Sequence, residues 1–263
     1  MPEGHTIHRL ARDHREWFAG ERVSVSSPQG RFTGAGVVDG DVLERTDAWG
    51  KHLFHHYEGG GIVHVHLGLF GKFRRYATPP PEPRDTVRMR IATGANVVDL
   101  TGATACELLT PDEKDAILER LGPDPIRRGA DPEVAYASLQ RRRIGIGRAL
   151  MDQAVVAGVG NVYRAEVLFV HGLHPEVPAN EVDEATWSAM WGTLVEWMRR
   201  GVRQRRIITT DPEEIGVPHH RMKRADRLYV YKQDRCRRCG TDIRRWDLAG
   251  RWAYACESCQ PPP

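Results

Sequence analysis

The segment Cys236-Arg-Arg-Cys239 is followed, after sixteen residues, by Cys256-Glu-Ser-Cys259 near the end of this 263-residue chain. Two Cys-x2-Cys pairs at this separation are typical of a site in which four thiolates bind one zinc ion. We therefore expect one structural zinc, held by Cys236, Cys239, Cys256 and Cys259. A unit this small buries little apolar surface, so the metal would supply most of its folding free energy. The sequence from Leu228 onward then predicts a β-ribbon held by the metal.

The cysteine pairs lie in a strongly basic part of the chain. Residues 199–251 contain sixteen Lys and Arg against seven Asp and Glu, a net charge of +9, whereas residues 1–198 carry a net charge of −5. A basic region that carries a metal finger is the electrostatic pattern expected of a nucleic-acid-binding protein. The alternative is an ordinary solvated charged face.

The composition is that of a soluble globular protein, with 40% hydrophobic and 28% charged residues. No apolar stretch approaches the length of a membrane span, and residues 1–20 carry charge throughout, so we expect neither a membrane segment nor a signal peptide. Cysteines in metal-binding pairs favour a reducing compartment. We therefore expect a cytoplasmic monomer, associated with the nucleoid if the organism is a bacterium. The fifth cysteine, Cys106, is expected in a core.

Hydrophobic periodicity divides the rest of the chain into three parts. Helical spacing over residues 7–18, ended by Gly20, precedes segments in which apolar and polar residues alternate, as at 63–67 and 87–91. Alternation predicts antiparallel sheets with one buried and one solvated face. The predicted domains are an N-terminal β-sandwich with one helix (1–112), a linker (113–130), a helical domain (131–227) and a zinc finger (228–263). Candidate helices of the second domain cover residues 132–139, 147–157, 161–170 and 184–200.

The segment Ala157-Gly-Val-Gly-Asn161 joins two of these candidate helices. Its glycines permit a tight turn and a close approach of the backbone to a ligand. Unpaired N–H groups at a helix start, beside an Asn side chain, suit a phosphate. An ordinary helix–turn–helix corner packed in a core explains the pattern equally well.

The other end of the chain begins Met1-Pro2-Glu3-Gly4. If Met1 is removed, Pro2 presents a secondary amine, which condenses with an aldehyde to an iminium that is an electron sink for elimination. An α-amino group has a reference pKa of about 7.7–8.0 against about 10.4 for lysine, so the terminus is the better nucleophile at neutral pH. Glu3 could move protons beside it.

Four motifs occur here in one order: the Pro-Glu-Gly start, Trp49-Gly-Lys51, the turn before Asn161 and the four-cysteine finger. Together they resemble the Fpg/Nei family of DNA glycosylase/AP lyases across essentially the whole chain. The resemblance implies a multidomain α+β fold with a β-sandwich, a helical domain containing a helix–two-turn–helix element, and a zinc-finger ribbon. It also implies a base-excision-repair enzyme that acts on damaged DNA.

The resemblance also implies roles for particular residues. Pro2 would attack C1′ of the damaged nucleotide. Glu3 would transfer protons on the sugar and during the elimination steps. Lys51 would contact a phosphate near the lesion and assist catalysis, and Asn161 would bind a backbone phosphate. Arg251 would bind the flanking phosphate from the finger's hairpin. Two arginines closer to the second cysteine are rivals for that last role, Arg244 and Arg245.

A flipped base leaves a gap that an enzyme of this kind must fill. Leu69 and Phe70 are apolar and lie between Gly68 and Gly71, directly after a predicted strand. An exposed apolar wedge suits insertion into the duplex. The alternative is that both are strand-end core residues.

Two sequence features that differ between branches of the family indicate which damaged base is the substrate. The guanine-lesion branch typically begins Pro-Glu-Leu and has a longer glycine-containing loop before the finger, whereas this chain begins Pro-Glu-Gly and has the stretch Ile207–Arg224. Both features are closer to the endonuclease VIII (Nei) branch, so we expect oxidised pyrimidines as substrates. An oxidised-purine glycosylase of the same family is the alternative, and a non-catalytic zinc-finger DNA-binding protein is the alternative of another class.

Two further departures concern histidine and threonine. His5 and Thr6 replace the Pro and Glu that the family usually has there, which affects the expected proton path. Five histidines also gather between His52 and His66. A second metal site is conceivable there, but alternate positions on a solvated strand face explain them more simply.

Overall fold

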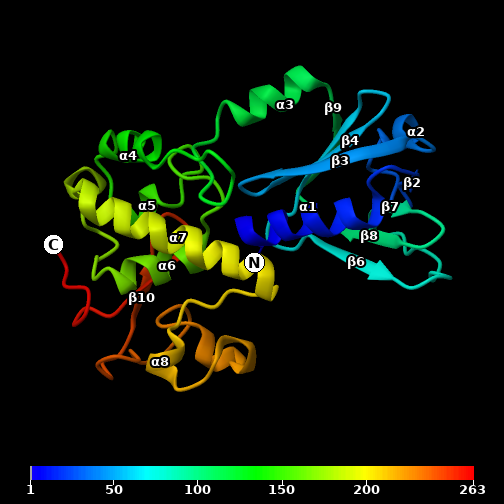
Figure 1. Ribbon diagram of the computed structural model, residues 1–263. Coiled ribbons are helices and arrows are strands. Elements are labelled where there is room, and N and C mark those ends of the chain that lie inside the picture. Colours follow the sequence, from blue (N-terminus) through cyan, green and yellow to red (C-terminus); the bar gives the residue numbers. More distant parts are fainter. Residues whose placement is uncertain (1) are drawn as a thin grey trace. The chain divides into compact units, whose positions relative to one another are not determined.

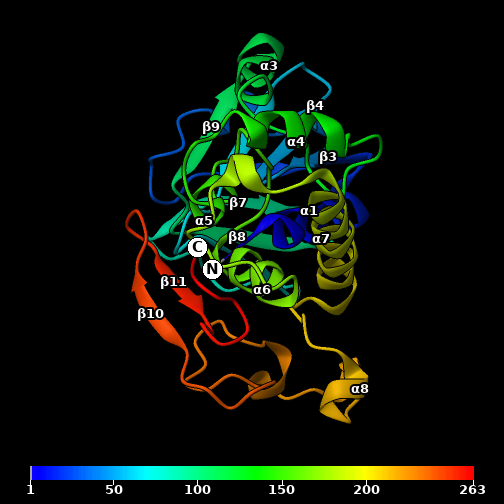
Figure 2. The ribbon, with the colours of Figure 1, turned by 90° about the vertical axis from the view of Figure 1, so that its left-hand side faces the viewer.

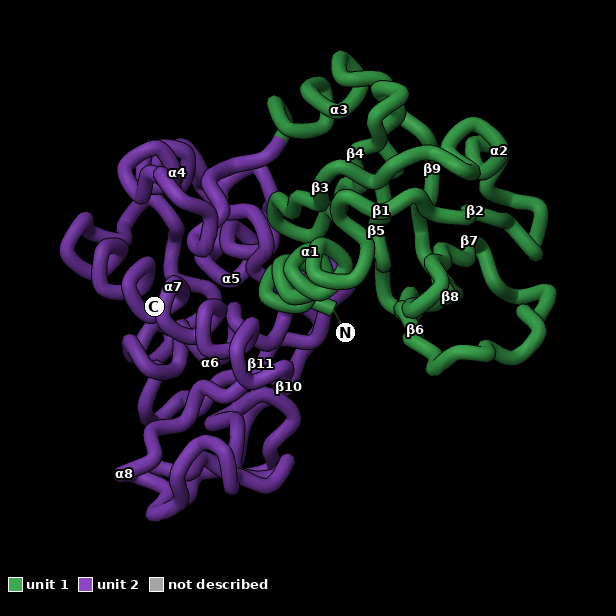
Figure 3. Tube along the Cα trace, turned by 45° about the vertical axis from the view of Figure 1, so that its right-hand side comes forward, with its two compact units in different colours: residues 1–120 green, residues 121–263 purple. Residues whose placement is uncertain are grey.

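A computed structural model describes residues 2–263, and the expected removal of Met1 concerns a residue outside this range. The chain divides into two compact units, residues 1–120 and 121–263 (Figure 3). Among the described residues, no helix is long and apolar enough to cross a membrane.

The first unit is a β-sandwich of two antiparallel sheets with three helices (Figure 1). The five-stranded sheet runs, in spatial order, β1 (Glu21–Arg22), β3 (Val42–Trp49), β4 (His52–Tyr57), β5 (Ile62–His66) and β9 (Ala105–Leu109). The four-stranded sheet runs β2 (Ser24–Ser26), β7 (Val87–Ala92), β8 (Val97–Thr101) and β6 (Lys72–Tyr76). The helices are α1 (Gly4–Phe18), α2 (Ala35–Val38) and α3 (Pro111–Leu118).

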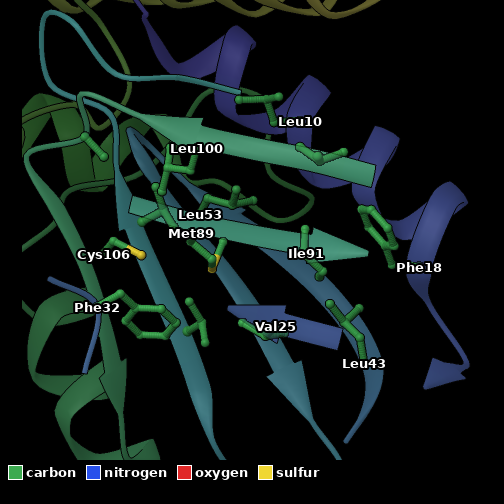
Figure 4. Packing of buried hydrophobic residues seen from close by; sticks show 14 of the residues in the cluster. Leu10, Phe18, Val25, Phe32, Leu43, Leu53, Met89, Ile91, Leu100 and Cys106 are labelled. Carbon is green, nitrogen blue, oxygen red and sulfur yellow. The ribbon is translucent and has the colours of Figure 1, made fainter. Parts of the chain in front are cut away.

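The core of this unit follows from the alternation in its strands. In β7 the side chains of Val87, Met89 and Ile91 are buried while their neighbours are half-buried. Met89 and Ile91 pack with residues of the other sheet and of α1, such as Leu53 and Phe18 (Figure 4). Cys106 lies in the same cluster, as its sequence context predicted. The predicted β-sandwich with one N-terminal helix is confirmed.

The expectation of a solvated face on β4 and β5 is wrong. His64 is 3% exposed and Phe54 is fully buried, although both point away from the core between the sheets. Helix α3 covers part of this face, and the Lys114 ammonium lies 5.0 Å from the centre of the Phe54 ring. The helix begins with a capping box, in which Thr110 and Glu113 each bond the other's backbone N–H. The helix overlaps the start of the predicted linker, residues 113–130.

The second unit contains the predicted helical part and the ribbon. Its helices are α4 (Pro132–Gln140), α5 (Ile146–Ala149), α6 (Asn161–Val170), α7 (Glu184–Gln204) and α8 (Pro212–Ile215), with short 3-10 turns at 179–181, 219–221 and 224–227. Strands β10 (Arg244–Asp247) and β11 (Trp252–Ala255) form the ribbon. The helices expected at 132–139, 161–170 and 184–200 are thus confirmed to within a few residues.

The prediction of a helix over residues 147–157 is wrong. Helix α5 ends at Ala149, and two turns lead from there to α6. The Asp152 side chain accepts the N–H of Ala154, which stabilises a turn in place of a helix. Val155 and Val156 are fully buried, so their apolar spacing reflects the core and not a helix face. The outcome is a helix–two-turn–helix element, as the resemblance implied.

The ribbon packs on helix α6 within the second unit (Figure 2). Phe169 of α6, Tyr229, Tyr254 and Cys256 belong to one buried cluster. The finger therefore shares a core with the helical part.

Candidate active site and nucleic-acid interface

Pro2 and Glu3 precede helix α1 directly. Glu3 is the residue at the helix start, in extended conformation, and its carbonyl accepts the N–H of Thr6 at 2.8 Å. Its side chain is fully buried, while Pro2 is half-buried. A carboxylate at the positive end of a helix is favourably placed. The fold therefore buries an acidic residue at the start of α1, directly after Pro2 in the chain.

The residues that depart from the family pattern lie on the first turn of α1. His5 is 4% exposed, and its Nε2 lies 3.1 Å from Thr6 Oγ1. Burial, assisted by the charge of Arg9, lowers the pKa of His5 to about 3. His5 is therefore a neutral, hydrogen-bonded residue at neutral pH.

Lys51 lies in a two-residue turn between β3 and β4, where Trp49 pairs with His52. Gly50 in this turn has φ +56°, a conformation that favours glycine. The Trp-Gly-Lys order is thus the order that a tight hairpin requires, and it places Lys51 at the hairpin's tip.

The histidines beside this turn form a hydrogen-bonded chain. His52 Nδ1 lies 2.9 Å from His64 Nε2, and His64 Nδ1 lies 2.8 Å from Glu107 Oε1. Burial lowers the pKa of His52 to about 3, and the charges of His64, His66 and Lys51 act in the same direction. These rings are neutral at neutral pH, and they bond to one another and to a carboxylate.

Leu69 and Phe70 lie in the turn between β5 and β6 and are 49% and 83% exposed. Gly68 has φ +63°, and a Cβ there would come 1.9 Å from Thr104 Oγ1. A Cβ on Gly71 would come 2.2 Å from the Leu67 carbonyl oxygen. Because glycine is required on both sides, the turn is tight and presents two large apolar side chains to solvent.

The turn before α6 is closed by one glutamine side chain. Gln153 Oε1 accepts the N–H of Gly158 at 3.0 Å, and its Nε2 donates to the Val159 carbonyl at 3.1 Å. Gly158 has φ +92°. Asn161 then begins α6 with only 4% of its surface exposed. Its Nδ2 donates to the carbonyl of Trp252 on the ribbon at 3.0 Å.

Arg164, one turn further along α6, is 1% exposed and joins the same network. Its guanidinium donates to Asn161 Oδ1, to the Trp252 carbonyl at 2.9 Å and to the Gly147 carbonyl at 3.3 Å. Since a guanidinium only donates, it fixes the Asn161 amide with its oxygen inward. The Asn161 nitrogen is thereby directed to the ribbon.

The four cysteines of the finger come together. Their sulfur atoms lie within 4.8 Å of one another, and among residues 2–263 they are the one group of three or more metal-ligand side chains with such geometry. The Thr241 hydroxyl and backbone N–H lower the pKa of Cys239 to about 6, which favours its thiolate. The cluster could therefore hold a metal ion.

The ribbon's turn positions Arg251. Leu248 and Arg251 bond each other's backbone across Ala249 and Gly250, which both have positive φ. Such two-residue turns match the twist of paired strands. Arg251 is exposed directly after the turn, next to the Trp252 carbonyl that α6 binds.

The two rival arginines contact other side chains of the ribbon and finger. Arg244 pairs with Glu257 at 2.5 Å and lies over the Trp246 ring. The Arg245 guanidinium lies 4.7 Å from the centre of the Trp252 ring. Both guanidinium groups thus contact side chains of the ribbon.

The structure thus brings Asn161 next to the strand that begins beside Arg251, within the second unit. The four cysteines also belong to the second unit, whereas the remaining predicted residues belong to the first: Pro2, Glu3, Lys51, Leu69 and Phe70. Sequence reasoning missed Arg164, Glu166 and Trp252. The signal that could have identified the first two is a charged residue inside an otherwise apolar helix, because a buried charge needs partners.

Comparison with known proteins identifies the family to which this chain belongs. Residues 1–103 match the formamidopyrimidine-DNA glycosylase N-terminal domain, and residues 121–212 match the formamidopyrimidine-DNA glycosylase H2TH domain. The chain is 48% identical over 268 residues to Endonuclease 8 1 of Mycobacterium tuberculosis, covering 99% of this chain and 100% of that one. It is 30% identical over 282 residues to the formamidopyrimidine-DNA glycosylase of Gloeobacter violaceus, covering 99% and 98%.

A solved structure shares the fold over the full length. The Fpg protein of Lactococcus lactis, in complex with DNA containing N7-benzyl-Fapy-dG, superposes with a TM-score of 0.81 at 20% identity, covering 99% of this chain and 100% of that one. The fold and the two domain matches define a DNA-repair glycosylase. This chain belongs to the Fpg/Nei family, whose members are DNA glycosylase/AP lyases. The alternative of a non-catalytic zinc-finger protein is thereby set aside.

Proposed function

We propose that this chain removes an oxidised base, preferentially a pyrimidine, from DNA and then cleaves the strand by β,δ-elimination. The observation that carries the proposal is the arrangement at the start of α1, where Pro2 is followed by the fully buried carboxylate of Glu3 in a member of this family.

The reaction begins at C1′ of a nucleotide flipped out of the duplex. The Pro2 nitrogen forms a bond to C1′, and the glycosidic bond breaks with its electron pair leaving on the base, which is protonated. The nitrogen then loses its proton, and its lone pair breaks the C1′–O4′ bond while O4′ takes up a proton, so that the sugar ring opens and an iminium remains at C1′. This iminium acidifies the C2′ proton, whose loss breaks the C3′–O bond and releases the 3′ phosphate. A second elimination breaks the C5′–O bond. Glu3 is the side chain that moves these protons.

The remaining residues hold the DNA. Lys51, Asn161 and Arg251 bind backbone phosphates, which fixes the position of the strand without reading its sequence. Leu69 and Phe70 fill the space left by the flipped base, and their exposure on a tight turn supports this role.

The cysteine cluster holds one structural zinc. A tetrahedral zinc with bonds of about 2.3 Å places its sulfur ligands about 3.8 Å apart. The Cys236–Cys259 and Cys239–Cys256 sulfur distances, 3.8 Å and 3.4 Å, fit this geometry. A closed set of four thiolates leaves no open coordination position, so the metal maintains the ribbon and takes no part in the chemistry.

A preference for pyrimidines is supported by the Pro-Glu-Gly start and by the higher identity to the relative named Endonuclease 8 1 than to relatives named formamidopyrimidine-DNA glycosylase. The stretch Ile207–Arg224 would lie beside the flipped base.

The test is single-turnover cleavage of duplexes that carry either an oxidised pyrimidine or an oxidised guanine, with an abasic site as a common reference. We expect cleavage of the abasic duplex and faster base removal from the oxidised pyrimidine. Faster removal of oxidised guanine would assign the chain to the other branch, and no cleavage of any duplex would refute the proposal.

A further inference from the structure

Trp252 is exposed, although its backbone carbonyl is bound by side chains of α6. The residue is 51% exposed, and its carbonyl accepts hydrogen bonds from two buried side chains, those of Asn161 and Arg164. The fold therefore fixes the backbone from which an accessible indole projects.

The surroundings of the indole are basic. The Arg245 guanidinium stacks on it at 4.7 Å, and Arg251 precedes it in the chain. Asp247 pairs with Trp252 across the ribbon, but its carboxylate accepts the N–H of Gly250 at 3.2 Å and so helps to close the turn. An aromatic ring with a stacked arginine is a surface on which nucleotides pack, because every base has a π-face and the guanidinium attracts phosphate.

We propose that Trp252 and Arg245 form a second contact to the damaged strand, in which the indole packs on the nucleotide that adjoins the phosphate bound by Arg251. This inference rests on the proposed function, which places damaged DNA on the ribbon. The nucleotides beside a flipped base have lost a stacking partner, so an aromatic ring can replace part of that stacking. Asn161 and Arg164 act as positioning residues, since they hold the strand from which the indole projects.

The chain offers matched variants for a test. Trp252→Ala removes the ring, Trp252→Phe retains an aromatic face, and Val134→Ala truncates another exposed apolar residue, 55% exposed on α4. Each zinc-loaded full-length variant is titrated with a duplex that carries a tetrahydrofuran abasic-site analogue, over a range of salt concentrations. Zinc content and melting temperature of each variant are measured alongside.

Trp252→Ala is expected to weaken binding about tenfold, with an unchanged salt slope, because stacking on a base is worth about 1–3 kcal/mol and releases no counterion. Trp252→Phe should recover most of the affinity, and Val134→Ala should bind like the wild type. Arg245→Ala should reduce the salt slope by about one unit. Photo-crosslinking from 5-bromouracil next to the abasic site should map to the peptide that contains Trp252.

The inference is overturned if Trp252→Ala binds within twofold of the wild type, or if the crosslink maps elsewhere while the wild type still binds and cleaves abasic DNA. If the wild-type protein neither binds nor cleaves that DNA, the proposed function itself fails, and the two failures are thereby distinguished.

Discussion

The carboxylate of Glu166 accepts the backbone N–H of Tyr229 at 2.7 Å, joining helix α6 to the segment that leads into the ribbon. The same carboxylate accepts the N–H groups of Val230 and Tyr231 and the hydroxyl of Thr209. Glu166 is fully buried, and burial raises the pKa of its carboxyl against the opposing effect of these four donors. The Glu166 side chain thus supplies the hydrogen-bond acceptors that backbone carbonyls of a neighbouring strand would supply in a sheet.

Glu166→Ala should destabilise the second unit, because three backbone N–H groups lose their acceptor in a buried place. Each costs about 1–3 kcal/mol, so we expect a loss of at least about 3 kcal/mol in the free energy of unfolding. Glu166→Gln, which keeps one acceptor oxygen, should lose less. Urea denaturation measures both, with the exposed Glu184→Gln as control. A Glu166→Ala variant as stable as the control would contradict this account.

Removal of the metal should unfold the ribbon and abolish DNA binding while the β-sandwich remains folded. Binding of zinc to such a site is worth on the order of 10 kcal/mol, which the small apolar contacts of the ribbon cannot replace. Loss of the ribbon also withdraws Trp252 and Arg251 from their places beside Asn161. Elemental analysis should find one zinc per chain. Well under one zinc, or full DNA affinity after chelation, would refute the assignment.

The three proposed phosphate contacts should differ in their response to salt. Lys51→Ala and Arg251→Ala should each weaken binding to all sequences and reduce the slope of log affinity against log salt by about one unit, because each removes one ionic contact. Asn161→Ala should reduce affinity without changing the slope, since the amide is neutral. The exposed Arg141→Ala serves as control. If Arg251→Ala changes lesion preference but not the slope, Arg251 has been assigned the wrong role.

Stability of the first unit should decrease in acid because of a buried histidine pair. His14 Nδ1 lies 3.0 Å from His55 Nε2, and both rings are fully buried. Burial, with the neighbouring His56, lowers the pKa of His55 to about 3, and burial together with His55 lowers the pKa of His14. Below pH 6.5 the unfolded chain binds protons that the folded chain excludes, so stability falls as pH falls from about 6.5 towards about 3 and is constant above that window.

The expected slope is up to about 1.4 kcal/mol per pH unit for each such histidine. His55→Gln should reduce the slope of the unfolding free energy against pH by the contribution of about one titrating proton. Replacement of the exposed residue in His220→Gln should leave that slope unchanged. Urea midpoints measured across this pH range test the prediction. Equal pH dependence of wild type and His55→Gln would show that the pair does not carry the effect.

The sequence predicted the main elements because their periodicity reflects burial. The alternation in β7 and the spacing along α1 both follow the faces that pack in the core. The false helix over 147–157 arose where apolar residues are buried in turns, so that spacing alone could not distinguish a helix from a corner. Helix α3 was missed because its Pro at the first turn resembled a linker, although Thr110 and Glu113 formed a capping box.

The candidate site was predictable only where a motif carries its own chemistry. The spacing of the cysteine pairs predicts a metal site, and the glycines around Leu69 and Phe70 predict a tight turn. Each prediction needs only a short stretch of sequence. The contact between Asn161 and the Trp252 carbonyl joins residues 91 positions apart, and no local pattern encodes such a pairing. The bond from Arg164 to the same carbonyl spans 88 positions.

The central claim is that the nucleophile is the nitrogen of Pro2, and borohydride reduction tests it most directly. The protein is mixed with a duplex that carries an abasic site, reduced, digested and analysed by mass spectrometry, with the intact mass reporting whether Met1 has been removed. We predict a covalent adduct on a mature N-terminal Pro2, and less adduct with Pro2→Gly. An adduct that maps to Lys51, or a mature protein that retains Met1, would contradict the claim.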